Sequence, residues 1–298
     1  MREARAGGCW RGGRTGVNDD RHAKTWLFVP AHRPELVAKA LASAADGVML
    51  DLEDAVPDEC KAQARAALPA IPPRAHGRTW VRVNARATAW HADDVRAAMQ
   101  APSVQGVLCP KVEDVADLIA PGVLAARPGM AQGALVESAL GVMRLFGMLE
   151  RVPDVGMVMF GGAEGADLMT DLGCGWSIDG PELLHARQHT VLSARGFKRV
   201  ALVDGVYARV DDTEGLARDT RLSRGLGFRA RAVVHPSQIA VVNDIYAPTV
   251  DETAWATEVV QVFEAAVDHG TAALRLRGRL VDAAMYKAAR LTLGKSDQ

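Results

Sequence analysis

Short apolar runs rich in β-branched residues recur along the chain and alternate with Ala- and Leu-rich stretches of helical character. The runs begin about 29 residues apart, at Trp26, Val48, Trp80, Gly106, Gly133, Gly156, Val200 and Ala232. Apolar strands that alternate with helices at this spacing are typical of βα units and of a parallel sheet. Eight units without a ninth favour a closed (β/α)₈ TIM barrel over an open doubly wound sheet.

Helical patterns continue after the eighth run, over DETAWATEVVQVFEAAVDHG and VDAAMYKAARLTL, and the segment GTAALRLRGRL between them reads as a loop or a short hairpin. We therefore expect a barrel over residues 23–247 and a C-terminal helical extension over 248–298. This extension is too short for an independent domain, so it is expected to pack on the barrel, cap its mouth or reach a neighbouring subunit. Residues 1–22 lack an apolar core and are expected to be a disordered extension, not a secretory signal.

Composition narrows the function classes. The 298 residues are 49% hydrophobic and 24% charged, with a formal net charge of -1, so nothing in the bulk charge favours nucleic acid or a membrane surface as partner. No uncharged apolar run approaches the roughly 18 residues of a membrane helix. The four cysteines lie far apart without a CxxC, which disfavours zinc and disulfides and favours a reducing cytoplasm. Neither GxGxxG after the first run nor GxxxxGK[ST] occurs, which disfavours dinucleotide and NTP enzymes.

Polar residues occupy alternate positions in several of the apolar runs. Because side chains alternate along a strand, the apolar positions suit the helix side and the polar ones point into the barrel. The inward set is Asp51, Glu53, Arg82 and Glu137, near the C-terminal strand ends where barrel active sites are built. An unpaired buried charge is costly, so these acids need a metal, a cation or a substrate, unless they form internal ion pairs such as Arg82 with Asp51.

Acids at strand ends, without a histidine or cysteine cluster, favour a hard divalent cation such as Mg²⁺. Glu137 closes the fifth strand, and the loop FGGAEGADLMTDLG after the sixth strand adds Glu164, Asp167 and Asp171. Neighbouring strand ends place Glu137 within reach of this loop. The sequence therefore predicts a magnesium site at this end of the barrel.

One lysine and two histidines are weaker candidates. Lys111 ends the fourth strand and is expected to contact a phosphate or carboxylate, or to pair with Glu113, rather than to form a Schiff base. His185 and His189 lie four residues apart on an expected helix, away from the strand ends and without an HExxH motif. We interpret both histidines as surface or packing residues.

The motifs in order resemble the citrate lyase β-subunit-like family of the HpcH/HpaI aldolase superfamily. They are WLFVPAHRPEL, VMLDLEDAV, WVRVN, LCPKVE, ALVESALGV, MFGGAEGADLMTDLG, VDGVY and VVHPSQI, and they cover residues 25 to about 293. The resemblance implies a TIM barrel, a homotrimer or homohexamer, Mg²⁺ (or Mn²⁺ in its place), and an acyl-CoA thioester and a keto acid as ligands.

The resemblance also implies a carbon–carbon lyase that cleaves or forms a β-hydroxyacyl-CoA thioester such as malyl-, citramalyl- or citryl-CoA. Two alternatives stay open. One is a malyl-CoA-type thioesterase, which needs a positioned water and similar ligands. The other is a citrate lyase β subunit that acts only with an acyl-carrier partner.

Residue roles follow from the same resemblance. Glu137 and Asp167 match the family's metal ligands, although the metal loop is longer here than the usual GAED form, so Glu164 is an alternative to Asp167. The acids of LDLEDAV match those around the metal's waters, namely Asp51, Glu53 and Asp54.

Three further residues match positions that handle substrate. Arg82 matches the arginine that holds the keto-acid carboxylate, and Arg33 matches a coenzyme A or substrate contact of the first loop. Asp282 in GRLVDAA resembles an acid that reaches a neighbouring subunit's site as the acid/base. Its role would therefore require an oligomer.

Overall fold

The structure is a computed structural model that describes residues 22–268 and 271–295. All but the last residue of the expected N-terminal extension lie outside the described residues. Within them, the chain divides into two compact units, the first ending at Asn243 and the second beginning at Asp244. No helix of the described part is long and apolar enough to cross a membrane.

The first unit is a closed barrel of parallel strands, with β8 returning to pair with β1 through Thr25 and Arg231. Every strand contains or adjoins one of the predicted apolar runs, so the TIM-barrel prediction is confirmed. The strands are β1 (Thr25–Pro30), β2 (Gly47–Asp51), β3 (Arg78–Arg82), β4 (Gly106–Cys109), β5 (Ala131–Val136), β6 (Val155–Phe160), β7 (Ala201–Asp204) and β8 (Ala230–Val233).

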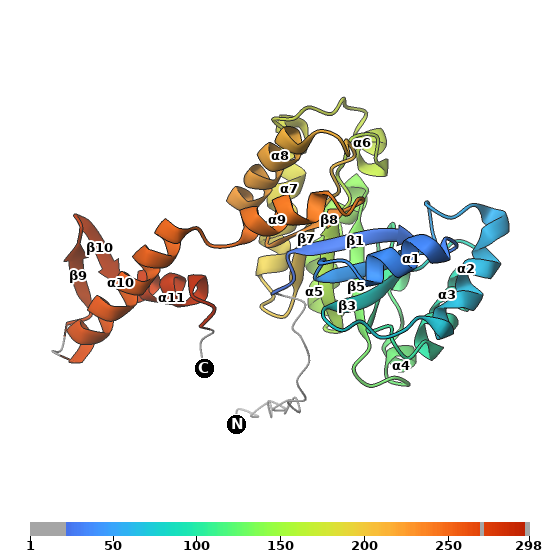
Figure 1. The fold of residues 1–298 in the computed structure, drawn as a ribbon, viewed down its shortest axis with the longest axis horizontal. Helices are drawn as coiled ribbons and strands as arrows, with labels where there is room; N and C mark the ends of the chain where they lie inside the picture. Colours follow the sequence, from blue (N-terminus) through green and yellow to red (C-terminus); the bar gives the residue numbers. More distant parts are fainter. Residues whose placement is uncertain (1–21, 269–270, 296–298) are drawn as a thin grey trace, which may run out of the picture. The chain divides into compact units, whose positions relative to one another are not determined.

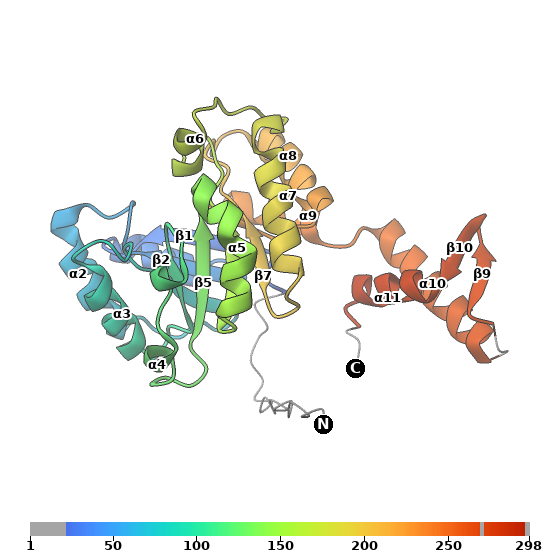
Figure 2. The same ribbon diagram turned by 180° about the vertical axis from the view of Figure 1, so that it is seen from behind.

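Helices connect the strands and lie outside the barrel, as two opposite views show (Figures 1 and 2). Two of them begin where a side chain caps the free backbone N–H groups: Ser138 accepts from Gly141, and Asp212 accepts from Gly215. The helices of this unit are α1 (Pro34–Leu41), α2 (Lys61–Ala67), α3 (His91–Gln100), α4 (Pro121–Leu124), α5 (Ala139–Arg151), α6 (Asp167–Leu172), α7 (Pro181–Arg195), α8 (Thr213–Leu226) and α9 (Gln238–Tyr246), and the 3₁₀ turns are η2 (Asp58–Cys60), η3 (Leu68–Ala70) and η4 (Val115–Asp117).

Two tryptophans dominate the barrel interior. Trp26 and Trp80 are fully buried, and their rings meet edge to face with centroids 5.5 Å apart. Each needs a glycine beside it: a Cβ at Gly47 would come within 2.3 Å of the Trp26 ring, and one at Gly106 within 2.2 Å of the Trp80 ring. This packing fills the barrel near the beginnings of β2 and β4.

The inward positions change from apolar to polar toward the C-terminal ends of the strands. Met49 and Trp80 belong to the interior apolar cluster, whereas Asp51 and Arg82 stand two residues later in the same strands. Since residues two apart share a face, the strands themselves direct these charges into the mouth of the barrel.

The second unit has a small apolar core of its own. Its elements are α10 (Val250–Asp268), the antiparallel hairpin of β9 (Ala273–Leu276) and β10 (Arg279–Asp282), and α11 (Ala283–Thr292). Phe263 of α10 stacks on Tyr286 of α11 with ring centroids 4.7 Å apart, and Val281 of β10 is fully buried. Between the two helices we expected a loop or a short hairpin, and the structure has the hairpin.

Candidate active site

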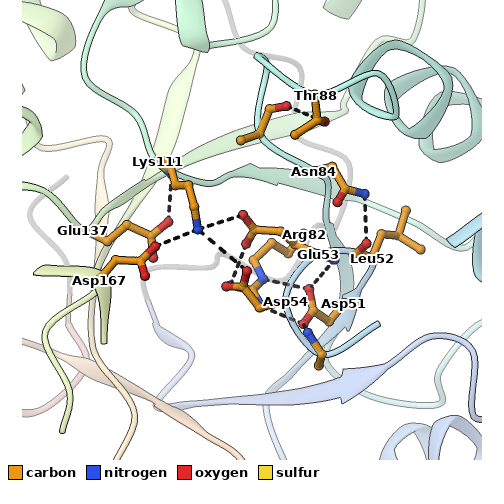
Figure 3. A network of polar contacts seen from close by, with 12 residues as sticks. Asp51, Leu52, Glu53, Asp54, Arg82, Asn84, Thr88, Lys111, Glu137 and Asp167 are labelled. Carbon is orange, nitrogen blue, oxygen red and sulfur yellow. Dashed lines mark hydrogen bonds and ion pairs between the residues drawn. The ribbon is translucent and has the colours of Figure 1, made fainter. Parts of the chain in front are cut away.

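Charged side chains from several βα units meet at the C-terminal ends of the strands (Figure 3). Asp51 and Arg82 are the last residues of β2 and β3, and Glu137 directly follows β5. Asp167 begins α6 in the loop after β6, and Lys111 stands two residues beyond β4. The inward orientation predicted for the strand-end charges is therefore what brings them together.

Arg82 and Asp51 form a buried bidentate ion pair, the arrangement that the sequence offered as an alternative to a ligand site. Arg82 Nε and Nη2 donate to the two carboxylate oxygens of Asp51 at 2.7 and 2.6 Å. Asp51 also accepts the N–H groups of Glu53 and Ala55, at 2.9 and 3.1 Å. Burial acts to raise the pKa of Asp51, but the guanidinium and these N–H groups outweigh it and hold the pKa below its usual range.

The remaining terminal nitrogen of Arg82 faces two more acids. Nη1 lies 2.9 Å from Glu53 Oε2, without hydrogen-bond geometry, and 3.3 Å from Asp54 Oδ2. The guanidinium also lies over the Phe28 ring, 5.2 Å from its centroid. Burial is the main reason that the pKa of Glu53 is raised to about 7, with Asp54 and Glu137 acting in the same direction.

Lys111 joins the two carboxylates that the sequence proposed as metal ligands. Its backbone N–H donates to Glu137 Oε1 at 2.8 Å, while its Nζ lies 2.7 Å from Asp167 Oδ2. The same ammonium lies 3.2 Å from Glu53 Oε1 and 3.7 Å from Asp54 Oδ1, so Lys111 makes the expected carboxylate contact, with these acids and not with Glu113. Lys111 adopts a left-handed backbone conformation, with φ +52°, which is uncommon for a residue other than glycine.

The donor set fits a hard divalent cation. Five carboxylates (Asp51, Glu53, Asp54, Glu137 and Asp167) face two cations (Arg82 and Lys111), which leaves an excess of three negative charges when all are ionised. Within residues 22–268 and 271–295, no three acidic, histidine or cysteine side chains already form a metal cage. Mg²⁺ needs only one or two protein carboxylates, because water and substrate complete its octahedron. Burial raises the pKa of Glu137, and a cation bound there would act in the opposite direction.

The two alternatives for the second metal ligand have different partners in the structure. Asp167 faces Lys111 beside Glu137, whereas both oxygens of Glu164 accept from Arg209 at 2.8 Å. Arg209 in turn lies over the Trp176 ring, 5.0 Å from its centroid. The geometry therefore favours Asp167, which the sequence also preferred.

Two predicted residues contact partners outside the cluster. Arg33 is half exposed and pairs with Glu35 in the first turn of α1, at 2.6 Å. Asp282 belongs to the second unit, where it caps α11 by accepting the N–H groups of Ala284 and Met285, each at 3.0 Å. This cap gives Asp282 a local structural role that the sequence analysis did not foresee.

Sequence reasoning also missed the residues that hold the LDLED turn in place. Lys61, buried on α2, donates to the carbonyl oxygens of Leu52 and Glu53 at 3.0 and 2.9 Å and to Asn84 Oδ1 at 2.7 Å. Asn84 Nδ2 donates to Asp94 at 2.6 Å. The available signal was the polar Asn84 two residues after Arg82, on the same inward side of the strand path.

The cluster opens into a cavity of about 440 Å³, within the size range of small-molecule sites. One part of its wall is charged and the other is apolar. The apolar wall consists of Phe28, Leu135, Met159, Val206, Ala232 and Val234, and the charged wall includes Asp51, Asp54, Arg82, Glu137 and Asp167.

Comparisons with known proteins agree with this geometry. Residues 24–236 match the HpcH/HpaI aldolase/citrate lyase family. A citrate lyase subunit beta-like protein of Mycobacterium tuberculosis is 38% identical over 278 residues, covering 92% of this chain and 95% of the relative. A (3S)-malyl-CoA thioesterase of Cereibacter sphaeroides is 32% identical over 274 residues, covering 91% of this chain and 93% of the relative.

Solved structures are similar as well. CitE from Mycobacterium tuberculosis in complex with magnesium, acetoacetate and coenzyme A has a TM-score of 0.76 at 34% identity, covering 93% of this chain and all (100%) of that one. A citrate lyase beta subunit from M. tuberculosis, complexed with oxaloacetate and magnesium, has a TM-score of 0.66 at 36% identity, covering 78% of this chain and 100% of that one.

Proposed function

The chain belongs to the HpcH/HpaI aldolase/citrate lyase family, and on that premise we propose that it is a Mg²⁺-dependent carbon–carbon lyase acting on a β-hydroxyacyl-CoA thioester. The candidate substrates are malyl-, citramalyl- and citryl-CoA, and the products are an acyl-CoA and a keto acid. The observation that carries the proposal is the excess of carboxylates beside one buried arginine at the barrel mouth. Such a site suits a divalent cation together with an anionic oxygen ligand.

Each group of the cluster has a part in this reaction. Glu137 and Asp167 would hold the cation, which when bound polarises the oxygen at the carbon where the bond breaks. Arg82 would bind the carboxylate of the keto-acid part through Nη1, while Asp51 keeps the guanidinium oriented. A preorganised donor of this kind stabilises the developing charge by about 3 kcal/mol.

Proton transfer at carbon needs a further group. In cleavage, the thioester enolate takes a proton at its carbon, and in condensation the methyl group of the acyl-CoA gives one up. We assign this step to Asp282 of a neighbouring subunit in a homotrimer or homohexamer, and a coenzyme A contact to Arg33. Both assignments rest on the family motifs.

A thioesterase is the second candidate, because a named relative hydrolyses malyl-CoA and covers most of this chain. The same cation and arginine would then serve a water molecule that attacks the thioester carbonyl. A citrate lyase β subunit that needs an acyl-carrier partner is the third candidate.

One assay separates the three. The purified chain alone is incubated with malyl-, citramalyl- and citryl-CoA and MgCl₂, and keto acid and free coenzyme A are measured separately. Keto acid without free coenzyme A supports the lyase, whereas free coenzyme A without keto acid supports the thioesterase. No turnover of any thioester would contradict both and favour the partner-dependent subunit.

Two matched variants complete the test. Glu137→Gln removes one carboxylate from the cluster, and we expect it to abolish Mg²⁺ binding and turnover. Glu164→Gln makes the same change in the exposed pair with Arg209, and we expect it to retain both. Full activity of EDTA-treated, metal-free protein would contradict the proposal.

A further inference from the structure

The wall of the active-site cavity has a charged part and an apolar part. The ends of β2, β3 and β5 and the start of α6 contribute its charges, including Asp51, Arg82, Glu137 and Asp167. The apolar part is hydrocarbon from β1, β5, β6 and β8 and from the residues that follow β7 and β8 (Phe28, Leu135, Met159, Val206, Ala232 and Val234). Leu135, Met159 and Ala232 belong to the apolar cluster that fills the barrel interior, so this wall is continuous with the core.

The positive charge in the cavity is sufficient for one carboxylate. Arg82 is the one cation among the described residues that line it, and two of its three nitrogens already serve Asp51. Lys111, beside the cavity, already faces Asp167, Glu53 and Asp54. A second substrate carboxylate would therefore meet either hydrocarbon or other carboxylates, and both are unfavourable for a desolvated anion.

Arg82 also sets the direction of the bound acid. Its guanidinium lies over the Phe28 ring, 5.2 Å from the centroid, at the border between the charged and the apolar wall. A carboxylate bound to Arg82 beside a cation on Glu137 and Asp167 would direct the rest of a 2-oxo acid away from those charges. The atoms beyond the carbonyl would then lie against Phe28 and its apolar neighbours.

Building on the function proposed above, we propose that this site selects 2-oxo acids with a single carboxylate and a short uncharged alkyl tail, and rejects those with a second carboxylate. Phe28, Leu135, Met159, Val206 and Val234 are the specificity-determining residues, because they contact the tail. The thioester substrate is then one whose hydroxyl-bearing carbon carries an alkyl group or hydrogen in place of a carboxymethyl group.

The test measures keto-acid affinity directly, by isothermal titration of the full-length protein with saturating MgCl₂. Pyruvate, 2-oxobutyrate and oxaloacetate are titrated in turn. We expect the two monocarboxylates to bind tighter than oxaloacetate by about tenfold or more, since the extra carboxylate is buried unpaired. Oxaloacetate binding as tightly as pyruvate, or tighter, would overturn the proposal.

A variant designed to change the keto-acid specificity provides a second test. Val234 is 40% exposed at the cavity wall, so Val234→Lys can place an ammonium there without burying it in the core. We expect this variant to shift the ratio of oxaloacetate to pyruvate affinity toward oxaloacetate by about tenfold. Val234→Met, with a similar length and no charge, should leave the ratio unchanged, and an equal shift in both variants would contradict the electrostatic argument.

These outcomes also separate this inference from the proposed function. If Mg²⁺ binds and neither the three keto acids nor glyoxylate, the keto-acid product of malyl-CoA, does, the lyase itself is contradicted. If oxaloacetate binds best and the C–C bond of a thioester is still cleaved, the selection for uncharged tails is wrong and the lyase stands.

Discussion

Replacing Arg82 by methionine tests how the acid cluster is held together. Methionine keeps a flexible chain of similar length and removes the guanidinium that donates to Asp51 at 2.7 and 2.6 Å. Asp51 is 1% exposed and would then keep only its two backbone N–H donors. Glu53 and Asp54 would lose the same cation.

The expected loss of stability is large because a buried charge loses its partner. Breaking one side of a buried ion pair typically costs about 3–5 kcal/mol of unfolding free energy. Adding Asp51→Asn removes the charge that was left unpaired, so the double variant should recover most of that loss. Arg86→Met is the control: Arg86 is exposed on the loop after β3, and we expect a change within about 0.5 kcal/mol.

The loss should also depend on pH, with a definite sign. Without Arg82, we expect burial to raise the pKa of Asp51 above its usual value of 3.8, because burial is the strongest single influence on this carboxyl group. A carboxyl group whose pKa is higher in the folded than in the unfolded state binds more protons when folded, so folding is favoured below that window and weakened as pH rises through it. The deficit of Arg82→Met relative to wild type should therefore shrink as the pH is lowered toward that usual value.

Tryptophan fluorescence during urea unfolding is the assay, because Trp26 and Trp80 are fully buried inside the barrel and report on that unit. A loss below about 1 kcal/mol for Arg82→Met would refute the reasoning, because that value is typical of an exposed pair. So would a double variant no more stable than the single one.

Three other changes probe separate parts of the site. Mg²⁺ binding should tighten between about pH 6 and pH 8, because burial raises the pKa of Glu53 to about 7 and the carboxylate gains its charge in this range. Isothermal titration of Glu53→Gln should show a Mg²⁺ affinity that depends less on pH. Asp282→Asn should retain the α11 cap and the melting temperature but lose turnover, whereas Asp282→Ala should also lose about 1 kcal/mol; a fully active Asp282→Asn protein would exclude the acid/base role. Arg209→Met, which frees Glu164 on the surface, should leave Mg²⁺ affinity unchanged by titration; tighter binding would instead point to Glu164 as the ligand, because Arg209 occupies both of its oxygens.

Much of the site follows from the alternation of side chains along strands. The spacing of Asp51 after Met49 and of Arg82 after Trp80 is enough to direct both charges inward, and the closed barrel then makes their strands neighbours. That the two would form an ion pair was foreseeable, because adjacent strand ends hold them in register.

The contacts of Lys111 could not be predicted from the alternation of side chains. Its contacts to Glu137 and Asp167 depend on a left-handed backbone conformation and on a long flexible side chain, neither of which a hydrophobic pattern encodes. The choice between Glu164 and Asp167 likewise depends on where α6 begins, after the six loop residues 161–166 that follow β6. Loop direction is decided by local backbone torsions, which a hydrophobic pattern does not predict.

The two tryptophan–glycine contacts in the barrel interior constrain how this sequence can diverge. An added Cβ at Gly47 would come within 2.3 Å of Trp26, and one at Gly106 within 2.2 Å of Trp80, so neither glycine can change first. Shrinking a tryptophan first would leave a cavity and lower stability. We therefore expect the two residues of each pair to change only together. Among related sequences, positions 26 and 47 should covary, and so should positions 80 and 106.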